Sequence, residues 1–143
     1  MPINPKKLEA LHEIAVKLPE GFTWAVFGSV YSALRGIEVE PNDIDLLMKE
    51  DAADEFRKIF KPKFVETEKM ELSQIDRYRI NEEDVEVIYS KTEEDDQEPL
   101  VEWEEIKIEK TENGVPLLPI DQIIKAYRKI DKTDRAKELE KLE

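Results

Sequence analysis

Short apolar segments that alternate with helix-forming segments constrain the fold of this chain more than any other feature. Residues 23–27 and 44–48 are apolar runs of strand length. Residues 5–18 and 51–60 carry apolar side chains at helical spacing, and residues 30–35 suit a short helix after the first strand. The first sixty residues are therefore predicted to run helix, strand, helix, strand, helix.

The rest of the chain is predicted to add strands before a helical end. The expected elements are strands at about 63–67, 71–80 and 84–89, a hairpin over 105–118 turning at Asn113-Gly114, and helix over about 120–141, either continuous or broken near Asp131. No repeat, linker or low-complexity block divides the sequence, so we predict one domain over residues 1–143. The pattern favours an α+β fold with helices packed on a mixed β-sheet.

Composition excludes several classes of protein. The 143 residues contain no cysteine, which rules out disulfides and thiolate metal sites within them and favours a cytoplasmic location. No apolar stretch approaches the roughly 18 residues of a membrane span, and no signal-peptide pattern is present, so we expect no membrane partner. The formal net charge of −13 repels nucleic acids at long range. A polyanionic ligand would therefore need a local basic patch or metal ions.

Two aspartates interrupt the apolar character of the second predicted strand. Asp43 and Asp45 are two residues apart, so their side chains are expected on the same face. Paired carboxylates attract a hard cation such as Mg²⁺. With 35 acidic residues in the chain, this spacing also arises by chance, and a solvated strand end is the alternative. The apolar neighbours strengthen the case for a ligand, because buried carboxylates are costly unless they are paired, protonated or metal-bound, although the pair alone is more typical of a solvated strand end.

The dipeptide Gly28-Ser29 follows the first predicted strand and opens the short helix after it. We expect Ser29 to be the N-cap of that helix. Backbone N–H groups at a helix N-terminus can bind an anion, and glycine lets a phosphate approach the chain closely. By itself the dipeptide is more typical of a plain turn.

Gly28-Ser29, thirteen intervening residues and then Asp43-Ile44-Asp45-Leu46 resemble the signature of the DNA polymerase β-like nucleotidyltransferase superfamily. The segment is most similar to the small nucleotidyltransferase-like proteins of bacteria and archaea. The resemblance implies the nucleotidyltransferase fold and transfer of a nucleoside monophosphate from a nucleoside triphosphate, such as ATP, to a hydroxyl. It implies two Mg²⁺ ions, with Mn²⁺ as a substitute, and phosphate binding by Gly28 and Ser29.

The resemblance also implies a third carboxylate from a later strand. Glu86 matches best, because it lies between Val85 and Val87 on a predicted strand, and Asp84 on the same face is the reserve candidate. Asp43, Asp45 and Glu86 would then be both the metal ligands and the catalytic residues. A solvent-facing strand residue is the alternative for Glu86.

A second resemblance to the same small proteins lies near the C-terminus, in a helix with lysine followed by an arginine-aspartate pattern. The matching residues are Lys125, Arg128, Asp131 and Asp134. Lys125, Arg128 and Lys132 fall on one face of a continuous helix. Lys125 and Arg128 would help to bind the nucleotide, and the alternative is a solvated face satisfied by ion pairs.

Other functions remain open at this stage. The stretch before Asp43 lacks the arginine or lysine that similar proteins often carry there. A catalytically weak or inactive relative is therefore an alternative, acting as a binding or regulatory module with a small protein partner, as in a toxin–antitoxin pair. A third hypothesis is an acidic structural domain in which the Gly-Ser dipeptide and the aspartate pair have no function. The acceptor can be tRNA, a protein or a small molecule.

Overall fold

The structure is a computed structural model, and it describes residues 4–70, 73–90, 100–111, 114–130 and 132–142. Its helices are α1 (Pro5–Lys17), α2 (Gly28–Leu34), α3 (Glu50–Ile59), α4 (Ile120–Lys129) and α5 (Thr133–Glu140), with 3-10 turns η1 (Lys61–Lys63) and η2 (Trp103–Glu105). Its strands are β1 (Trp24–Phe27), β2 (Ile44–Met48), β3 (Phe64–Lys69), β4 (Gln74–Ile80), β5 (Glu83–Tyr89), β6 (Glu109–Lys110) and β7 (Pro116–Leu117).

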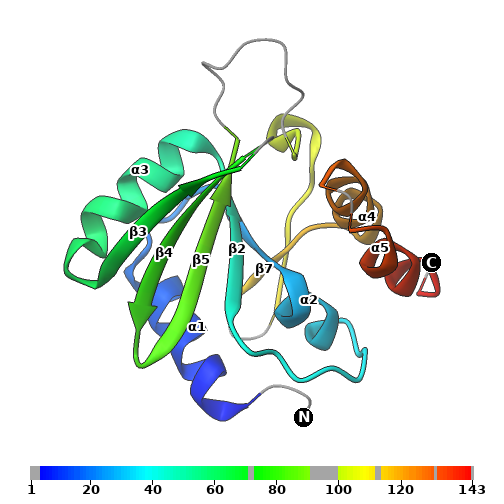
Figure 1. Cartoon of the computed structure of the whole chain (residues 1–143), viewed down its shortest axis with the longest axis horizontal. Helices are drawn as coiled ribbons and strands as arrows, with labels where there is room; N and C mark the ends of the chain where they lie inside the picture. The colour runs from blue at the N-terminus through cyan, green and yellow to red at the C-terminus, as the bar shows by residue number, and fades with distance from the viewer. Residues whose placement is uncertain (1–3, 71–72, 91–99, 112–113, 131, 143) are drawn as a thin grey trace.

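Five strands form the main sheet in the order β1-β2-β5-β4-β3 (Figure 1). β2 and β5 run parallel, and the other neighbouring strands are antiparallel. The register pairs Asp45 with both Phe27 and Glu86, and it pairs Glu86 with Arg77. Since residues directly opposite each other point to the same side of a sheet, these four side chains share one face. We call it the site face.

The opposite face of the sheet is covered by α1 and α3. Lys7 of α1 binds Glu83 of β5 at 2.5 Å, and Arg57 of α3 binds Asp76 of β4 at 2.6 Å. Both contacts join a helix to the sheet face that carries the alternate residues of each strand. The helices α2, α4 and α5 lie on the other side (Figure 1).

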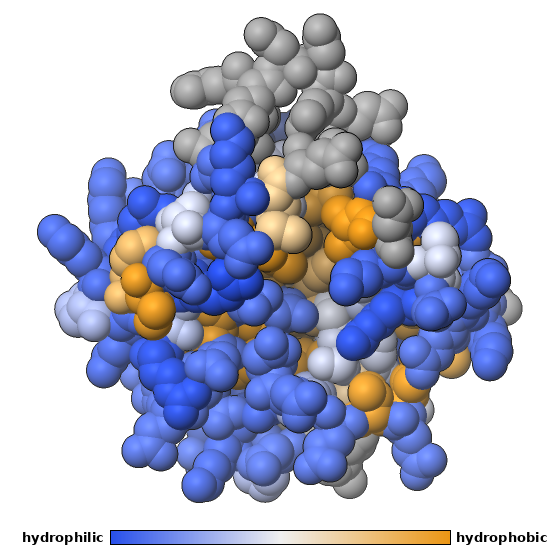
Figure 2. Space-filling model, in the orientation of Figure 1, coloured by the Kyte–Doolittle hydropathy of each residue, from blue (hydrophilic) through white to orange (hydrophobic). Residues whose placement is uncertain are grey.

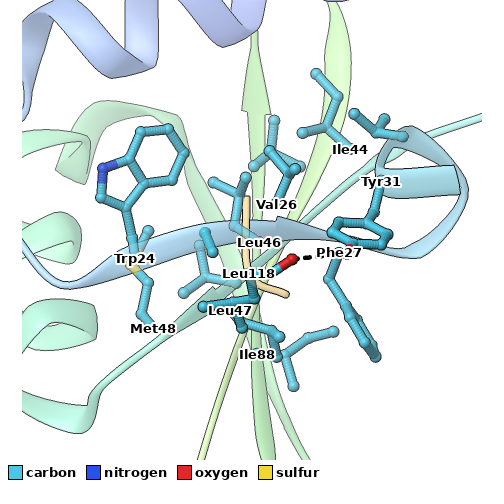
Figure 3. Packing of buried hydrophobic residues seen from close by; sticks show 14 of the residues in the cluster. Trp24, Val26, Phe27, Tyr31, Ile44, Leu46, Leu47, Met48, Ile88 and Leu118 are labelled. Carbon is cyan, nitrogen blue, oxygen red and sulfur yellow. Dashed lines mark hydrogen bonds between the residues drawn. The ribbon is translucent and has the colours of Figure 1, made fainter. Parts of the chain in front are cut away.

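The core lies on both sides of β1 and β2, whose residues are almost completely buried. Figure 3 shows the cluster around Trp24, Leu46 and Met48. The Tyr31 hydroxyl of α2 donates a hydrogen bond of 2.6 Å to the Leu118 carbonyl, which joins the start of the chain to the segment before α4 (Figure 3). These contacts hold α2 and α4 beside the ends of β1 and β2.

The predicted α+β architecture with a mixed sheet is confirmed, and most predicted elements lie within a few residues of their expected positions. Residues 109–110 and 116–117 pair as the predicted hairpin, although Asn113 lies outside the described residues. The C-terminal helix is broken, because α4 ends at Lys129 and α5 begins at Thr133. Asp131 itself lies outside the described residues.

The helices of the described structure were compared with the length and apolar character of a membrane span. Within the described ranges, no helix is both long enough and apolar enough to cross a bilayer.

Candidate active site

The turn between β1 and α2 is built around Gly28. The helix begins at Gly28 directly after the strand, and this residue has a φ of +65°, a backbone conformation that glycine adopts most readily. A Cβ atom added at Gly28 would collide with the Asp45 carboxylate. Glycine is therefore needed here for the turn itself and for the close approach of the neighbouring carboxylate.

The expected N-cap role of Ser29 is wrong. The helix starts two residues earlier than predicted, so Ser29 lies inside the first turn, and Phe27 is the N-cap residue without a side-chain cap. The physical reason is the positive φ of Gly28, which turns the chain from strand to helix in a single residue. Ser29 is partly exposed at the end of β1.

Three carboxylates converge beside this turn. Asp43 immediately precedes β2, Asp45 lies on β2, and Glu86 lies opposite Asp45 on the parallel strand β5. One oxygen atom from each of the three can be chosen so that all lie within 4.8 Å of one another. The structure thus brings together the three acidic residues that the sequence singled out.

Asp45 is the least solvated of the three carboxylates. Its Oδ1 atom is buried and has no hydrogen-bond partner in the described part of the chain. Burial, followed by repulsion from Asp43 and Glu86, raises the pKa of Asp45 to about 7. A buried carboxylate oxygen with no donor is costly unless something positive occupies the space beside it.

Glu86 and the reserve candidate Asp84 have different surroundings. Glu86 is partly buried and accepts a weak hydrogen bond of 3.4 Å from Arg77 of β4, whose guanidinium also contacts Glu68 at 2.6 Å. Asp84 is exposed and binds Arg79 at 2.7 Å. Glu86, and not Asp84, therefore joins the aspartate pair.

A cavity of about 360 Å³ opens in front of the carboxylates, between the site face and the C-terminal helices. Its lining comes from the β1–α2 turn, the sheet and the α4–α5 segment: Phe27, Gly28, Asp45, Met70, Ser73, Ile75, Glu86, Ile88, Tyr127, Lys129, Ile130, Lys132 and Arg135. Figure 2 shows a mainly hydrophilic surface with apolar atoms visible in the hollow between the sheet and these helices. The cavity combines acidic, basic and apolar walls in a volume typical of small-ligand sites.

Aromatic stacking holds α4 over this part of the sheet. The Tyr127 ring stacks on the Phe27 ring with a centroid distance of 4.5 Å. Burial raises the pKa of the Tyr127 hydroxyl above its ordinary value, so the group stays neutral at physiological pH. This contact fixes the distance between the C-terminal helices and the carboxylates.

The predicted nucleotide-binding cations Lys125 and Arg128 do not line this cavity. Lys125 is exposed, and Arg128 forms an ion pair with Glu140 of α5. Their role in nucleotide binding stays a prediction. The cavity receives Lys132 and Arg135 instead, because the break between α4 and α5 turns Lys132 away from the face that it would share with Arg128 in a continuous helix.

The residues present fit a divalent cation. Carboxylate oxygens are the preferred ligands of Mg²⁺ and Mn²⁺, and the group Asp43, Asp45 and Glu86 supplies three of them at close range. The buried, unpartnered Oδ1 atom of Asp45 is the group that a cation would satisfy.

Comparisons with known proteins point in the same direction. No protein-family model matches the chain, and no curated protein matches it at a significant level. A solved structure, that of a "putative nucleotidyltransferase" from Thermotoga maritima, is similar with a TM-score of 0.73 and 28% sequence identity. The likeness covers 98% of this chain and 94% of that one. It confirms the resemblance to small nucleotidyltransferase-like proteins and the nucleotidyltransferase fold.

Proposed function

We propose that this protein is a Mg²⁺-dependent nucleotidyltransferase that moves a nucleoside monophosphate from a nucleoside triphosphate to a hydroxyl acceptor. One observation carries the proposal: three carboxylates converge beside Gly28, and one of their buried oxygens has no partner among the described residues. The likeness to the Thermotoga maritima structure supports the reaction class. The cavity volume suits one nucleotide.

The chain's own residues take distinct roles in this proposal. Asp43 and Asp45 would hold the metal ions, and Glu86 would complete the ligand set. The backbone around Gly28 and Ser29 would receive phosphate oxygens, because no side chain stands between Gly28 and the carboxylates. When bound, the cations would neutralise the phosphates and stabilise the negative charge that develops during transfer.

The transfer itself is a substitution at phosphorus. The acceptor oxygen forms a bond to the α-phosphorus, the bond from that phosphorus to the oxygen bridging to the β-phosphate breaks, and pyrophosphate leaves. The acceptor proton would pass to a site carboxylate, with Glu86, which lines the cavity, as the candidate base. The apolar lining residues Ile75, Ile88 and Ile130 would pack against the nucleoside.

A pair of matched variants tests the proposal. Asp43→Asn/Asp45→Asn keeps the side-chain shapes but removes both charges, so calorimetric binding of Mn²⁺ and of Mg²⁺ with ATP should be lost. Asp84→Asn is the control, because Asp84 is an exposed acid on the same sheet face that binds Arg79. Equal metal binding by the wild type and the double variant would overturn the metal assignment.

Activity needs a second measurement, because binding alone also fits an inactive regulatory relative. The protein is incubated with α-labelled nucleoside triphosphates and Mg²⁺ against tRNA, protein and small hydroxyl compounds in turn. Transfer of label to an acceptor, absent in the double variant, supports the enzyme. Metal-dependent nucleotide binding without transfer to any acceptor class would favour the binding module, including one half of a toxin–antitoxin pair.

A further inference from the structure

The cavity wall formed by the C-terminal helices carries three cationic residues, Lys129, Lys132 and Arg135. Lys132 lies directly before α5 and Arg135 lies in its first turn, and both line the cavity together with Gly28, Asp45 and Glu86. Both are exposed at this wall. The positive charges of Arg135 and Lys132 act on Asp45 in the direction that favours its ionised form, which reflects their proximity to the site.

Arg135 differs from the other arginines of the chain. The sequence has six, and five of them contact a carboxylate: Arg35, Arg57, Arg77, Arg79 and Arg128. Within the described ranges, Arg135 has no carboxylate partner at ion-pair distance, although the chain has 35 acidic residues. Lys132 likewise has no ion pair in that part of the structure. In the described structure Lys132 and Arg135 thus have no carboxylate partner at ion-pair distance, and the Arg135 guanidinium lies beside the neutral Tyr127 hydroxyl.

Charge and shape identify the ligand class that would pair with them. A guanidinium donates two parallel hydrogen bonds to phosphate oxygens, and an ammonium is a compact partner for one. Apart from these cations, the cavity is lined mainly by apolar side chains and by the carboxylates Asp45 and Glu86, so an anion there would find its positive partners in the cations or in bound metal ions. A polyphosphate would receive donors from both walls.

We infer that Lys132 and Arg135 bind the β- and γ-phosphates of the nucleotide, across the cavity from the Gly28 turn. The inference rests on the proposed function, because it assigns the anion-binding half of the same site. It replaces the expectation from sequence that Lys125 and Arg128 supply this charge, and it gives the break between α4 and α5 a role in turning Lys132 and Arg135 toward the site.

The test uses two double variants that each remove two positive charges from the same pair of helices. Lys132→Ala/Arg135→Ala removes two of the cavity cations, and Lys125→Ala/Arg128→Ala removes the exposed pair outside the cavity. Binding of AMP, ADP and a non-hydrolysable ATP analogue is measured by calorimetry with saturating Mg²⁺, and circular dichroism melting checks that each variant is folded.

The wild type should bind more tightly with each added phosphate. In Lys132→Ala/Arg135→Ala this gain should flatten, with the ATP analogue binding about tenfold to a hundredfold more weakly and AMP changed by much less. Lys125→Ala/Arg128→Ala should keep the wild-type gain. Arg135→Lys, which keeps the charge, should retain most of the affinity for the ATP analogue.

The affinity for Mn²⁺ in the absence of nucleotide should not fall with the affinity for the ATP analogue in Lys132→Ala/Arg135→Ala. Removal of two cations near the carboxylates should leave Mn²⁺ affinity at alkaline pH unchanged or higher, because the repulsion between like charges falls. A merely damaged site would lose metal and nucleotide together, and that result would overturn the inference.

The remaining outcomes separate the inference from the proposed function. If the wild type and Lys132→Ala/Arg135→Ala bind the ATP analogue equally, while Asp43→Asn/Asp45→Asn loses it, the inference is wrong and the proposed function stands. If the wild type binds neither Mn²⁺ nor the ATP analogue, the proposed function fails, and the inference fails with it.

Discussion

Asp76 and Asp45 are two aspartates on opposite faces of one sheet, and their carboxylates have contrasting surroundings. Asp76 is only 1% exposed, and its Oδ1 atom accepts hydrogen bonds from Arg57 at 2.6 Å, Thr67 at 2.6 Å and Tyr89 at 3.1 Å. These donors come from α3, β3 and β5. The carboxylate therefore joins three elements and is fully satisfied by the fold.

Asp45 has no comparable set of donors. Its neighbours in the site are two further carboxylates, its Oδ1 atom is buried without a hydrogen-bond partner in the described structure, and its pKa is raised to about 7. Asp76 is surrounded by an arginine and two hydroxyl groups, whereas Asp45 lies beside two other carboxylates. The contrast separates a carboxylate held by the fold from one whose surroundings support the proposed role as a cation ligand.

The largest expected effect is on stability and comes from removing the Asp76 carboxylate. Asp76→Ala should lower the free energy of unfolding by about 3–5 kcal/mol, because it leaves Arg57 without its carboxylate partner and leaves the Tyr89 hydroxyl with Gln74 as its remaining acceptor. Urea denaturation followed by circular dichroism measures the loss. Mn²⁺ binding by the folded fraction should be unchanged, and a variant with wild-type stability would show that the cluster is not structural.

Gly28→Ala tests the surroundings of Asp45, because the added methyl group occupies the space of its carboxylate. A Cβ at this position collides with the Asp45 carboxylate, in addition to the strain of a positive φ, so we expect a loss of about 2–3 kcal/mol in unfolding free energy together with weakened metal binding.

Gly36→Ala is the matched control, because Gly36 also has a positive φ of +96° but nothing lies within 4 Å of its added Cβ. It should cost about 1 kcal/mol from strain alone and leave metal binding intact. Equal effects of the two substitutions on metal binding would contradict the role given to the Gly28 turn.

The pH dependence of stability should carry the signature of Asp45. Its pKa is about 7 in the folded state and near 3.8 in the unfolded chain, so the folded state binds the proton more tightly between these values. The contribution of Asp45 to stability is therefore fully present at about pH 4, falls as the pH rises to 7 and is absent above it. Asp45→Asn should be about 1–3 kcal/mol more stable than the wild type at pH 8.

Thermal or urea unfolding of both proteins from pH 4 to pH 8 measures this difference. Saturating Mg²⁺ at pH 8 should reduce it, because the ion stabilises only the protein that binds it. Superimposable stability profiles of the two proteins without metal would show that Asp45 ionises normally, and the comparison with Asp76 would then lose its electrostatic basis.

The smallest expected effect concerns the link between Glu86 and Arg77. Arg77→Gln removes the 3.4 Å contact to Glu86 as well as the stronger contact to Glu68, so transfer activity should fall by a few fold with stability changed by less than about 1 kcal/mol. Arg79→Gln, which removes an exposed contact to Asp84, is the control and should leave activity unchanged. Steady-state rates with Mg²⁺ and the identified acceptor measure the effect, and an equal loss in both variants would contradict a positioning role for Arg77.

The amino-acid sequence by itself determined most of the elements that form, and it singled out the acidic residues that the proposed function uses. Apolar spacing marked the strands that became β1 and β2, because burial depends on periodicity that is local in the chain. The motif formed by Gly28, Asp43 and Asp45 predicted the position of the candidate site. The strand-to-helix turn was recognised too, but Ser29 was misassigned as its cap because the φ of Gly28 cannot be read from residue types.

Only the tertiary structure decided which side chains meet. Glu86 rather than Asp84 joins the aspartate pair because of the register between β2 and β5, which depends on residues 41 positions apart. The cavity receives Lys132 and Arg135 because α4 ends three residues before Lys132, and the buried Asp76 cluster needs three elements to converge. The periodicity of apolar residues depends on neighbouring positions in the chain. Strand pairing, helix ends and the desolvation of side chains depend on how distant segments pack together.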